Sequence, residues 1–111
     1  MGIANIDHCR VYDSSDDFFS LGGTVVMKLS TDAAIAVCLR AAQQGFVVAR
    51  IEGGIWHFPG FEATLDCIWD GVAPPVDLNA AERNNQAAAE FVRAESPPHD
   101  VFLVTAPPIT G

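Results

Sequence analysis

Apolar and polar residues follow two different periods along the chain, and the changes of period predict the order of its elements. Apolar residues recur every three or four positions over residues 32–44 and 78–94, which predicts two amphipathic helices. Five further segments are alternating, β-branched or compactly apolar, as strands are. We therefore expect strands at residues 24–29, 46–52, 55–58, 61–69 and 101–105.

Local signals define the ends of both helices. Ser30 or Thr31 can accept hydrogen bonds from free amides at the start of the first helix, and Gly45 can take the left-handed conformation that closes it. Asp77 or Asn79 can cap the second helix. The buried stripe of the first helix is predicted to comprise Ala34, Ile35, Cys38, Leu39, Ala41 and Ala42. In the second helix we expect Ala88, Phe91 and Val92 to face inward.

Glycine and proline divide the central strands. Gly53-Gly54 is a plausible hairpin turn between residues 46–52 and 55–58, and Pro59-Gly60 marks a bend or bulge before residues 61–69. Period-two alternation then predicts one core-like face and one polar face for this strand. The core-like face would carry Phe61, Ala63, Leu65, Cys67 and Trp69. The other face would carry Glu62, Thr64, Asp66 and Ile68.

The predicted order is strand, helix, three strands, helix and strand. This order is typical of an α+β fold with a mainly antiparallel sheet and two principal helices packed on one face. A chain of 111 residues can bury about two thirds of its unfolded surface, so a core forms without a metal or disulfide. We expect a single domain over residues 1–111.

Charge and cysteine content restrict the partners and the compartment. Fourteen acidic residues against six basic ones give a net charge of −8, which opposes direct binding to nucleic acid or to an anionic membrane. The charge favours a basic partner, although it can also serve solubility alone. Three cysteines without a close pair predict a reduced cytoplasmic protein, and the sequence shows no secretory signal or membrane-spanning run.

Catalytic and metal chemistry find little support in the sequence. His8, His57 and His99 form no ligand set with the cysteines, because His8-Cys9 lacks a second close pair. Cys38 and Cys67 fall on apolar faces, where a thiol is inert. Glu62 and Asp66 would lie about 13 Å apart on a strand, which is too wide for a glycosidase pair. We therefore predict no catalytic residue, no metal and no cofactor.

A binding surface is the better interpretation of the stretch from Ile55 to Asp70, which holds both tryptophans of the chain. Trp56 suits an anchor because a partly exposed indole buries a large area on binding. The carboxylates of Glu62, Asp66 and Asp70 can pair with lysine and arginine. Three more acidic residues precede them in the chain, namely Asp13, Asp16 and Asp17. The alternatives are that the tryptophans lie in the core and that the carboxylates only face solvent.

This central region resembles the small acidic immunity proteins that neutralise bacterial polymorphic toxins, including those of contact-dependent growth inhibition. The resemblance covers residues 24–71 and rests on Trp56, residues 59–61 and residues 66–70, with the preceding alanine-rich helix and VVAR strand. It implies a one-to-one inhibitor that binds a toxin's C-terminal domain, often a nuclease, and blocks its active site. Neither turnover nor a cofactor is implied.

Two other classes of function remain open. A small ligand-binding domain or enzyme would use His57 and Asp66 as a polar pair beside an apolar pocket. An adaptor would keep its acidic surface for solubility and pair a sheet edge with another copy. A pH-dependent affinity for a metabolite favours the first class, and a concentration-dependent mass favours the second.

Overall fold

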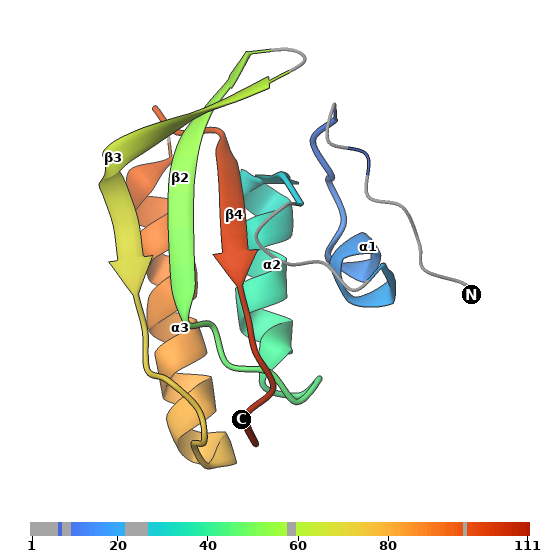
Figure 1. Cartoon of the computed structure of the whole chain (residues 1–111), viewed down its shortest axis with the longest axis vertical. Helices are drawn as coiled ribbons and strands as arrows, with labels where there is room; N and C mark the ends of the chain where they lie inside the picture. The colour runs from blue at the N-terminus through green and yellow to red at the C-terminus, as the bar shows by residue number, and fades with distance from the viewer. Residues whose placement is uncertain (1–6, 8–9, 22–26, 58–59, 97) are drawn as a thin grey trace.

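The computed structural model describes residues 7, 10–21, 27–57, 60–96 and 98–111, and it describes the backbone alone for residues 60–66. Figure 1 shows a layer of strands lying over a layer of helices. The elements in chain order are α1 (Ser15–Ser20), β1 (Leu29–Ser30), α2 (Thr31–Ala41), β2 (Arg50–His57), β3 (Gly60–Asp70), α3 (Leu78–Glu95) and β4 (Val101–Thr105). No helix in these ranges is long and apolar enough to cross a membrane.

The sheet has the strand order β1-β4-β2-β3, and each pair of neighbouring strands is antiparallel. Helices α2 and α3 lie side by side on one face of this sheet (Figure 1). The predicted α+β class, with two principal helices on one face, is therefore confirmed. The short helix α1 packs against α2, at the side of the molecule opposite to β3 (Figure 1).

The core lies between the sheet and the two long helices. Ile51, Phe102 and Val104 are fully buried on the sheet side, and Val37 and Val92 on the helix side. Alanines supply much of the remaining helix surface in the core, which lets α2 and α3 approach each other closely. The predicted stripe of α2 is right except at Leu39, which is 48% exposed, and it omitted Val37. Leu39 lies on the flank of the helix, because the buried stripe follows the line of Ala34, Val37, Cys38 and Ala41.

The predicted capping residues are confirmed, but α2 ends at Ala41, three residues before the predicted Gln44. The Ser30 hydroxyl accepts a hydrogen bond from the Ala33 amide at 3.2 Å, and the Asp77 carboxylate accepts one from the Ala80 amide at 2.7 Å. Gly45 has a φ of 89°, which is the left-handed conformation that follows α2. These caps are local, so the sequence around each helix end is sufficient to predict them.

The predicted hairpin turn at Gly53-Gly54 is wrong. Strand β2 runs through both glycines, and its pairing with β3 begins where His57 faces Gly60. A Cβ atom at Gly53 would overlap the Sγ of Cys67 and lie 3.0 Å from the Phe102 ring. This glycine therefore admits a close approach between strands and does not form a turn. Only two strands, and not three, consequently separate the long helices.

The pairing of β2 with β3 changes register along its length. Ile51 faces Trp69 and Glu52 faces Ile68, but Gly54 already faces Ala63. Two steps on β2 thus match five steps on β3, so the single alternation predicted for residues 61–69 does not hold throughout. Cys67 is buried and Trp69 packs against the core, as predicted. The side chains of residues 61, 63 and 65 lie outside the described part of the chain.

The first predicted strand is shorter than expected, because strand pairing is observed for Leu29 and Ser30 only. Residues 24–26 of that prediction lie outside the described residues. Residues 46–49 were predicted as the start of a strand, but they precede β2. They contact the C-terminal segment only at isolated positions, which include the hydrogen bond from the Val47 amide to the Pro107 carbonyl at 2.9 Å. The last strand occupies residues 101–105, as predicted.

Candidate functional site

Within the described ranges, no helix covers the face of the sheet that is turned away from α2 and α3 (Figure 1). Because Ile51 and Gly53 face the helices, the alternation of the strand places Arg50, Glu52 and Trp56 on the opposite face. Residues of β3 and β4 that pair beside them continue the same surface. We call this surface the open face. Its described side chains are Arg50, Glu52, Trp56, Ile68, Asp70, Leu103 and Thr105, together with Val101, which pairs beside Gly54 and is buried.

One end of the open face carries a small network of charges. Arg50 lies between Asp70 on β3 and Thr105 on β4. Its Nη1 is 3.0 Å from Asp70 Oδ1 and its Nε is 3.6 Å from Glu52 Oε2. The side chains of Arg50, Glu52 and Asp70 are 43%, 35% and 66% exposed. Ion pairs this exposed contribute little to folding, so their main effect is to orient two carboxylates toward solvent.

The other end of the open face carries Trp56. Its side chain is half-buried, and its backbone amide donates a hydrogen bond to Asp100 Oδ1 at 3.0 Å. The Asp100 amide in turn donates to the Gly54 carbonyl at 3.1 Å. Asp100 thereby fixes the backbone of β2 on both sides of Ile55. The indole is presented from a backbone that is held in place, which lowers the entropy lost on binding.

The structure brings two of the predicted binding residues, Trp56 and Asp70, to the same face. Asp70 pairs beside Arg50, six residues before Trp56 on β2, so the two lie roughly 20 Å apart along the strand. The backbone of Glu62 pairs with Ile55. The side chains of Glu62 and Asp66 lie outside the described residues, so the suggested pair of His57 with Asp66 stays a prediction. His57 itself is exposed.

The second acidic group lies elsewhere. Asp13 is exposed and Asp17 is half-buried, both at α1. Asp16 Oδ1 is 2.7 Å from Arg40 Nη1, and the same nitrogen donates to the Ser15 hydroxyl at 2.7 Å. This contact ties α1 to α2, so Asp16 has a role within the fold. Because α1 and β3 lie on opposite sides of the molecule (Figure 1), the two acidic groups do not form one surface.

Sequence reasoning missed Arg50, Glu52 and Asp100. The first two would follow from period-two alternation around Ile51, had residues 50–57 been taken as one strand. The misplaced turn at Gly53-Gly54 divided this strand and hid the alternation. No local pattern indicates the role of Asp100, because its hydrogen bond to the Trp56 amide joins residues that are far apart in the sequence.

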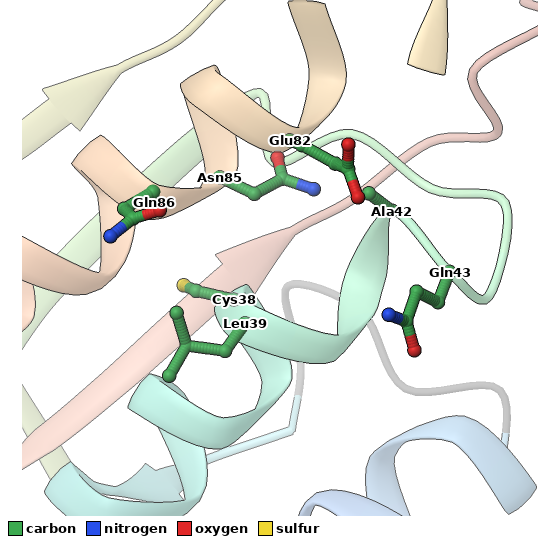
Figure 2. Close-up of a pocket in the computed structure, with 7 residues that line it drawn as sticks. All are labelled: Cys38, Leu39, Ala42, Gln43, Glu82, Asn85 and Gln86. Atoms are coloured by element: carbon green, nitrogen blue, oxygen red, sulfur yellow. The ribbon is translucent and has the colours of Figure 1, made fainter. Parts of the chain in front are cut away.

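A cavity of about 120 Å³ lies between α2 and α3 (Figure 2). Its lining residues are Cys38, Leu39, Ala42, Gln43, Glu82, Asn85 and Gln86. Burial raises the pKa of the Cys38 thiol to about 12, so the thiol is protonated and is no nucleophile at neutral pH. This agrees with the inert thiol expected at Cys38.

Asn85, which also lines the cavity, serves the fold. Its Oδ1 accepts a hydrogen bond from the Val48 amide at 2.8 Å, and its Nδ2 donates to the Phe46 carbonyl at 3.1 Å. The buried amide therefore satisfies the backbone that leads into β2. The Asn85 amide is therefore committed to structure and is not available as a binding group of this cavity.

One further cluster contains possible metal ligands. Within the described ranges, Cys67, Glu95 and His99 place one ligand atom each within 4.8 Å of one another. No local pattern indicates this cluster, because its residues come from β3, the end of α3 and the following connection. The prediction of no metal considered His99 with the cysteines, and it did not foresee that the fold brings Cys67, Glu95 and His99 together.

The family model described as Colicin-E5 Imm protein matches residues 27–106. The chain belongs to the colicin-E5 immunity protein family. It is 79% identical over 107 residues to the immunity protein CdiI of Burkholderia pseudomallei, which covers 96% of this chain and 98% of that protein. It is also 34% identical over 80 residues to the colicin-E5 immunity protein of Escherichia coli, covering 71% of this chain and 96% of that protein.

Membership of this family confirms the resemblance to toxin-neutralising immunity proteins. Immunity proteins act as inhibitors, so the expectation of a binding protein and not an enzyme is confirmed as well. The matched segment contains β1–β4, α2 and α3, and it leaves out α1. The open face therefore lies entirely within the part of the chain that defines the family.

Proposed function

We propose that this immunity protein binds the C-terminal domain of its cognate toxin one-to-one through the open face. We further propose that the toxin is a nuclease and that the complex forms in the cytoplasm and blocks the basic active-site surface. The observation that carries this proposal is the open face itself, which combines an anchored tryptophan with carboxylates on an uncovered sheet.

Charge supports a basic partner. The chain has a net charge of −8, and a nuclease surface that holds phosphate groups is rich in lysine and arginine. Opposite charges accelerate the encounter of two proteins, and a buried aromatic anchor slows their dissociation. A stable complex of this kind buries about 1,600 Å² in total. An interface of that size exceeds the charged end of the open face and would extend along it to Trp56.

The individual roles follow from position. Trp56 is the proposed anchor and Asp70 the proposed steering carboxylate on the open face, and Glu62 and Asp66, on the same strand, are proposed to add to the steering charge. Glu52 adds a carboxylate beside Arg50. In the second acidic group, Asp13 and Asp17 contribute to the long-range field, whereas Asp16 is engaged by Arg40.

The experiment has two parts. Bacteria that induce the toxin's C-terminal domain should grow when this protein is co-expressed, and calorimetry should give one-to-one binding. Replacing Glu62, Asp66 and Asp70 by lysine should weaken binding and reduce its dependence on salt, because the net charge falls in magnitude from −8 to −2. The matched control is Glu90→Lys, which changes an exposed carboxylate on α3, on the covered side of the sheet.

Three results would contradict the proposal. Failure to rescue growth combined with absent binding would contradict the inhibitor function for this toxin. Rescue with an affinity that the three lysines leave unchanged would place the interface on another surface. Rescue without any reduction of the toxin's nucleic-acid cleavage in vitro would contradict the proposed block of the active site.

A further inference from the structure

Three potential metal ligands meet at the C-terminal end of α3. The Sγ of Cys67, a carboxylate oxygen of Glu95 and a ring nitrogen of His99 all lie within 4.8 Å of one another. Cys67 is fully buried, His99 is 9% exposed, and Glu95 is half-buried. Three separate segments thus direct a thiol, a carboxylate and an imidazole into one partly enclosed site. Because two of the three side chains are buried and only one is a carboxylate, this arrangement is not an exposed acidic patch.

The hydrogen bond of His99 favours metal binding. Its Nδ1 lies 3.0 Å from the Glu95 carbonyl oxygen. Because a carbonyl oxygen can only accept, Nδ1 carries the proton and Nε2 retains the electron pair that a metal ion needs. Histidine ligands in proteins commonly hold their second nitrogen by such a bond to a backbone carbonyl. The same Nδ1 is 3.8 Å from Glu95 Oε1, so the imidazole lies beside the carboxylate and would offer its Nε2 to an ion.

The surroundings of Cys67 close the site on one side and leave it accessible on the other. The backbone of β2 lies so close to the sulfur that only glycine fits at position 53. The Phe102 ring borders the same space. On the far side, the Glu95 side chain is 36% exposed, so an ion and a water ligand can enter from solvent. Cys67 also lies in the segment of β3 where the register with β2 shifts.

We propose that Cys67, Glu95 and His99 bind a divalent transition-metal ion, zinc, with water as the fourth ligand. Thiolate, imidazole and carboxylate are the ligands that zinc takes in proteins, in tetrahedral sites. On binding, the Cys67 thiol releases its proton to the solvent and its sulfur bonds to the metal. The ion joins β3 to the end of α3 and to the connection that enters β4, so it stabilises the folded chain. This site is independent of toxin binding.

The test is a titration of the reduced, tag-free full chain with Zn²⁺ by calorimetry, and with Co²⁺ by absorption spectroscopy. We expect one ion per chain and a thiolate-to-Co²⁺ charge-transfer band. Zn²⁺ at 100 times its Kd should raise the Tm by about 10 °C, because the ion binds the folded state. If wild-type protein binds neither ion, the proposal is wrong and His99 serves only to bond the end of α3.

Variants assign the ligands. Cys67→Ala, His99→Ala and Glu95→Gln should each weaken Zn²⁺ binding by at least about tenfold, and Cys67→Ala should abolish the charge-transfer band. Glu95→Gln keeps the shape of a half-exposed side chain, so its result does not depend on whether the other two variants fold.

Matched controls are Cys38→Ala, which removes the other thiol buried in the described core, and His57→Ala, which removes an exposed imidazole. Both should bind as wild type. Cys9→Ser tests the N-terminal thiol, and we expect it to leave the band unchanged. Binding that survives Cys67→Ala and Glu95→Gln, or that disappears in Cys9→Ser, would overturn the proposed site.

Discussion

The two faces of the sheet are made of alternate residues of the same strands, yet they differ in what determines their side chains. On the covered face, Ile51, Phe102 and Val104 are fully buried against α2 and α3. On the open face, Arg50 and Trp56 remain in contact with solvent. Packing within the molecule explains the first set. The charged members of the second set contribute little to folding, and we propose that a partner explains their presence.

We therefore expect substitutions on the two faces of the sheet to affect different quantities. Changes on the covered face should lower the free energy of unfolding and leave the toxin contacts intact. Changes on the open face should lower toxin affinity and leave unfolding almost unchanged. Residues that alter both quantities to the same degree would show that the division between the faces is wrong.

The largest effect should come from Phe102 and its neighbour Leu103, which lie on opposite faces of β4. Phe102→Ala should lower the free energy of unfolding by about 3–5 kcal/mol, because it opens a cavity in the core. Leu103→Ala, its matched control on the open face, should cost less than about 1.5 kcal/mol because the side chain is only partly buried. Urea denaturation measures both values, and equal losses would contradict the comparison.

A smaller loss is expected when the buried amide of Asn85 is removed. Asn85→Ala should cost about 2–3 kcal/mol, because the Val48 amide and the Phe46 carbonyl lose their partner. Gln86→Ala, at the next position on α3, is exposed and should change stability by less than about 0.5 kcal/mol. Thermal or urea unfolding distinguishes the two. A loss at Asn85 no greater than at Gln86 would mean that water satisfies these backbone groups.

Gly53 tests the close approach of β2 to β3. Gly53→Ala should destabilise the fold by about 1–3 kcal/mol, because its new Cβ meets the Cys67 sulfur and the Phe102 ring. The double variant with Cys67→Ala should recover part of that loss, since contacting residues are energetically coupled. A double-mutant cycle measured in urea gives the coupling, and strictly additive losses would show that the sulfur is not the obstacle.

The smallest effect should come from the contact between α1 and α2. Asp16→Ala should lower the free energy of unfolding by no more than about 0.5 kcal/mol, because its bond to Arg40 is largely solvent-exposed. Asp13→Ala, an exposed control on the same segment, should have no measurable effect. A larger loss at Asp16 would show that α1 contributes to the core through this ion pair.

Much of the fold could be predicted from the sequence because its signals are local. The caps at Ser30 and Asp77, the left-handed Gly45 and the run VFLVT all depend on a few adjacent residues. The turn prediction at Gly53-Gly54 failed because a glycine pair has the same appearance in a turn as in a strand. The Cys67 sulfur that requires Gly53 is remote in the sequence.

The candidate site was predictable only in part for the same reason. The aromatic and acidic composition of residues 55–70 indicated a binding surface, and Trp56 and Asp70 do share the open face. Arg50 and Glu52 were hidden by the misplaced turn. The register shift within β3 and the meeting of Cys67 with Glu95 and His99 depend on tertiary contacts that no period in the sequence records.

The most direct test of the central claim is the Kd of the toxin domain for Trp56→Ala, compared with wild type and with Glu90→Lys. If the open face is the interface, removing its aromatic anchor should weaken binding by about 30-fold or more, equivalent to about 2 kcal/mol, and should mainly raise the dissociation rate. The free energy of unfolding should fall by much less than that of Phe102→Ala. Wild-type affinity in Trp56→Ala, with the protein folded, would contradict the claim that this face binds the toxin.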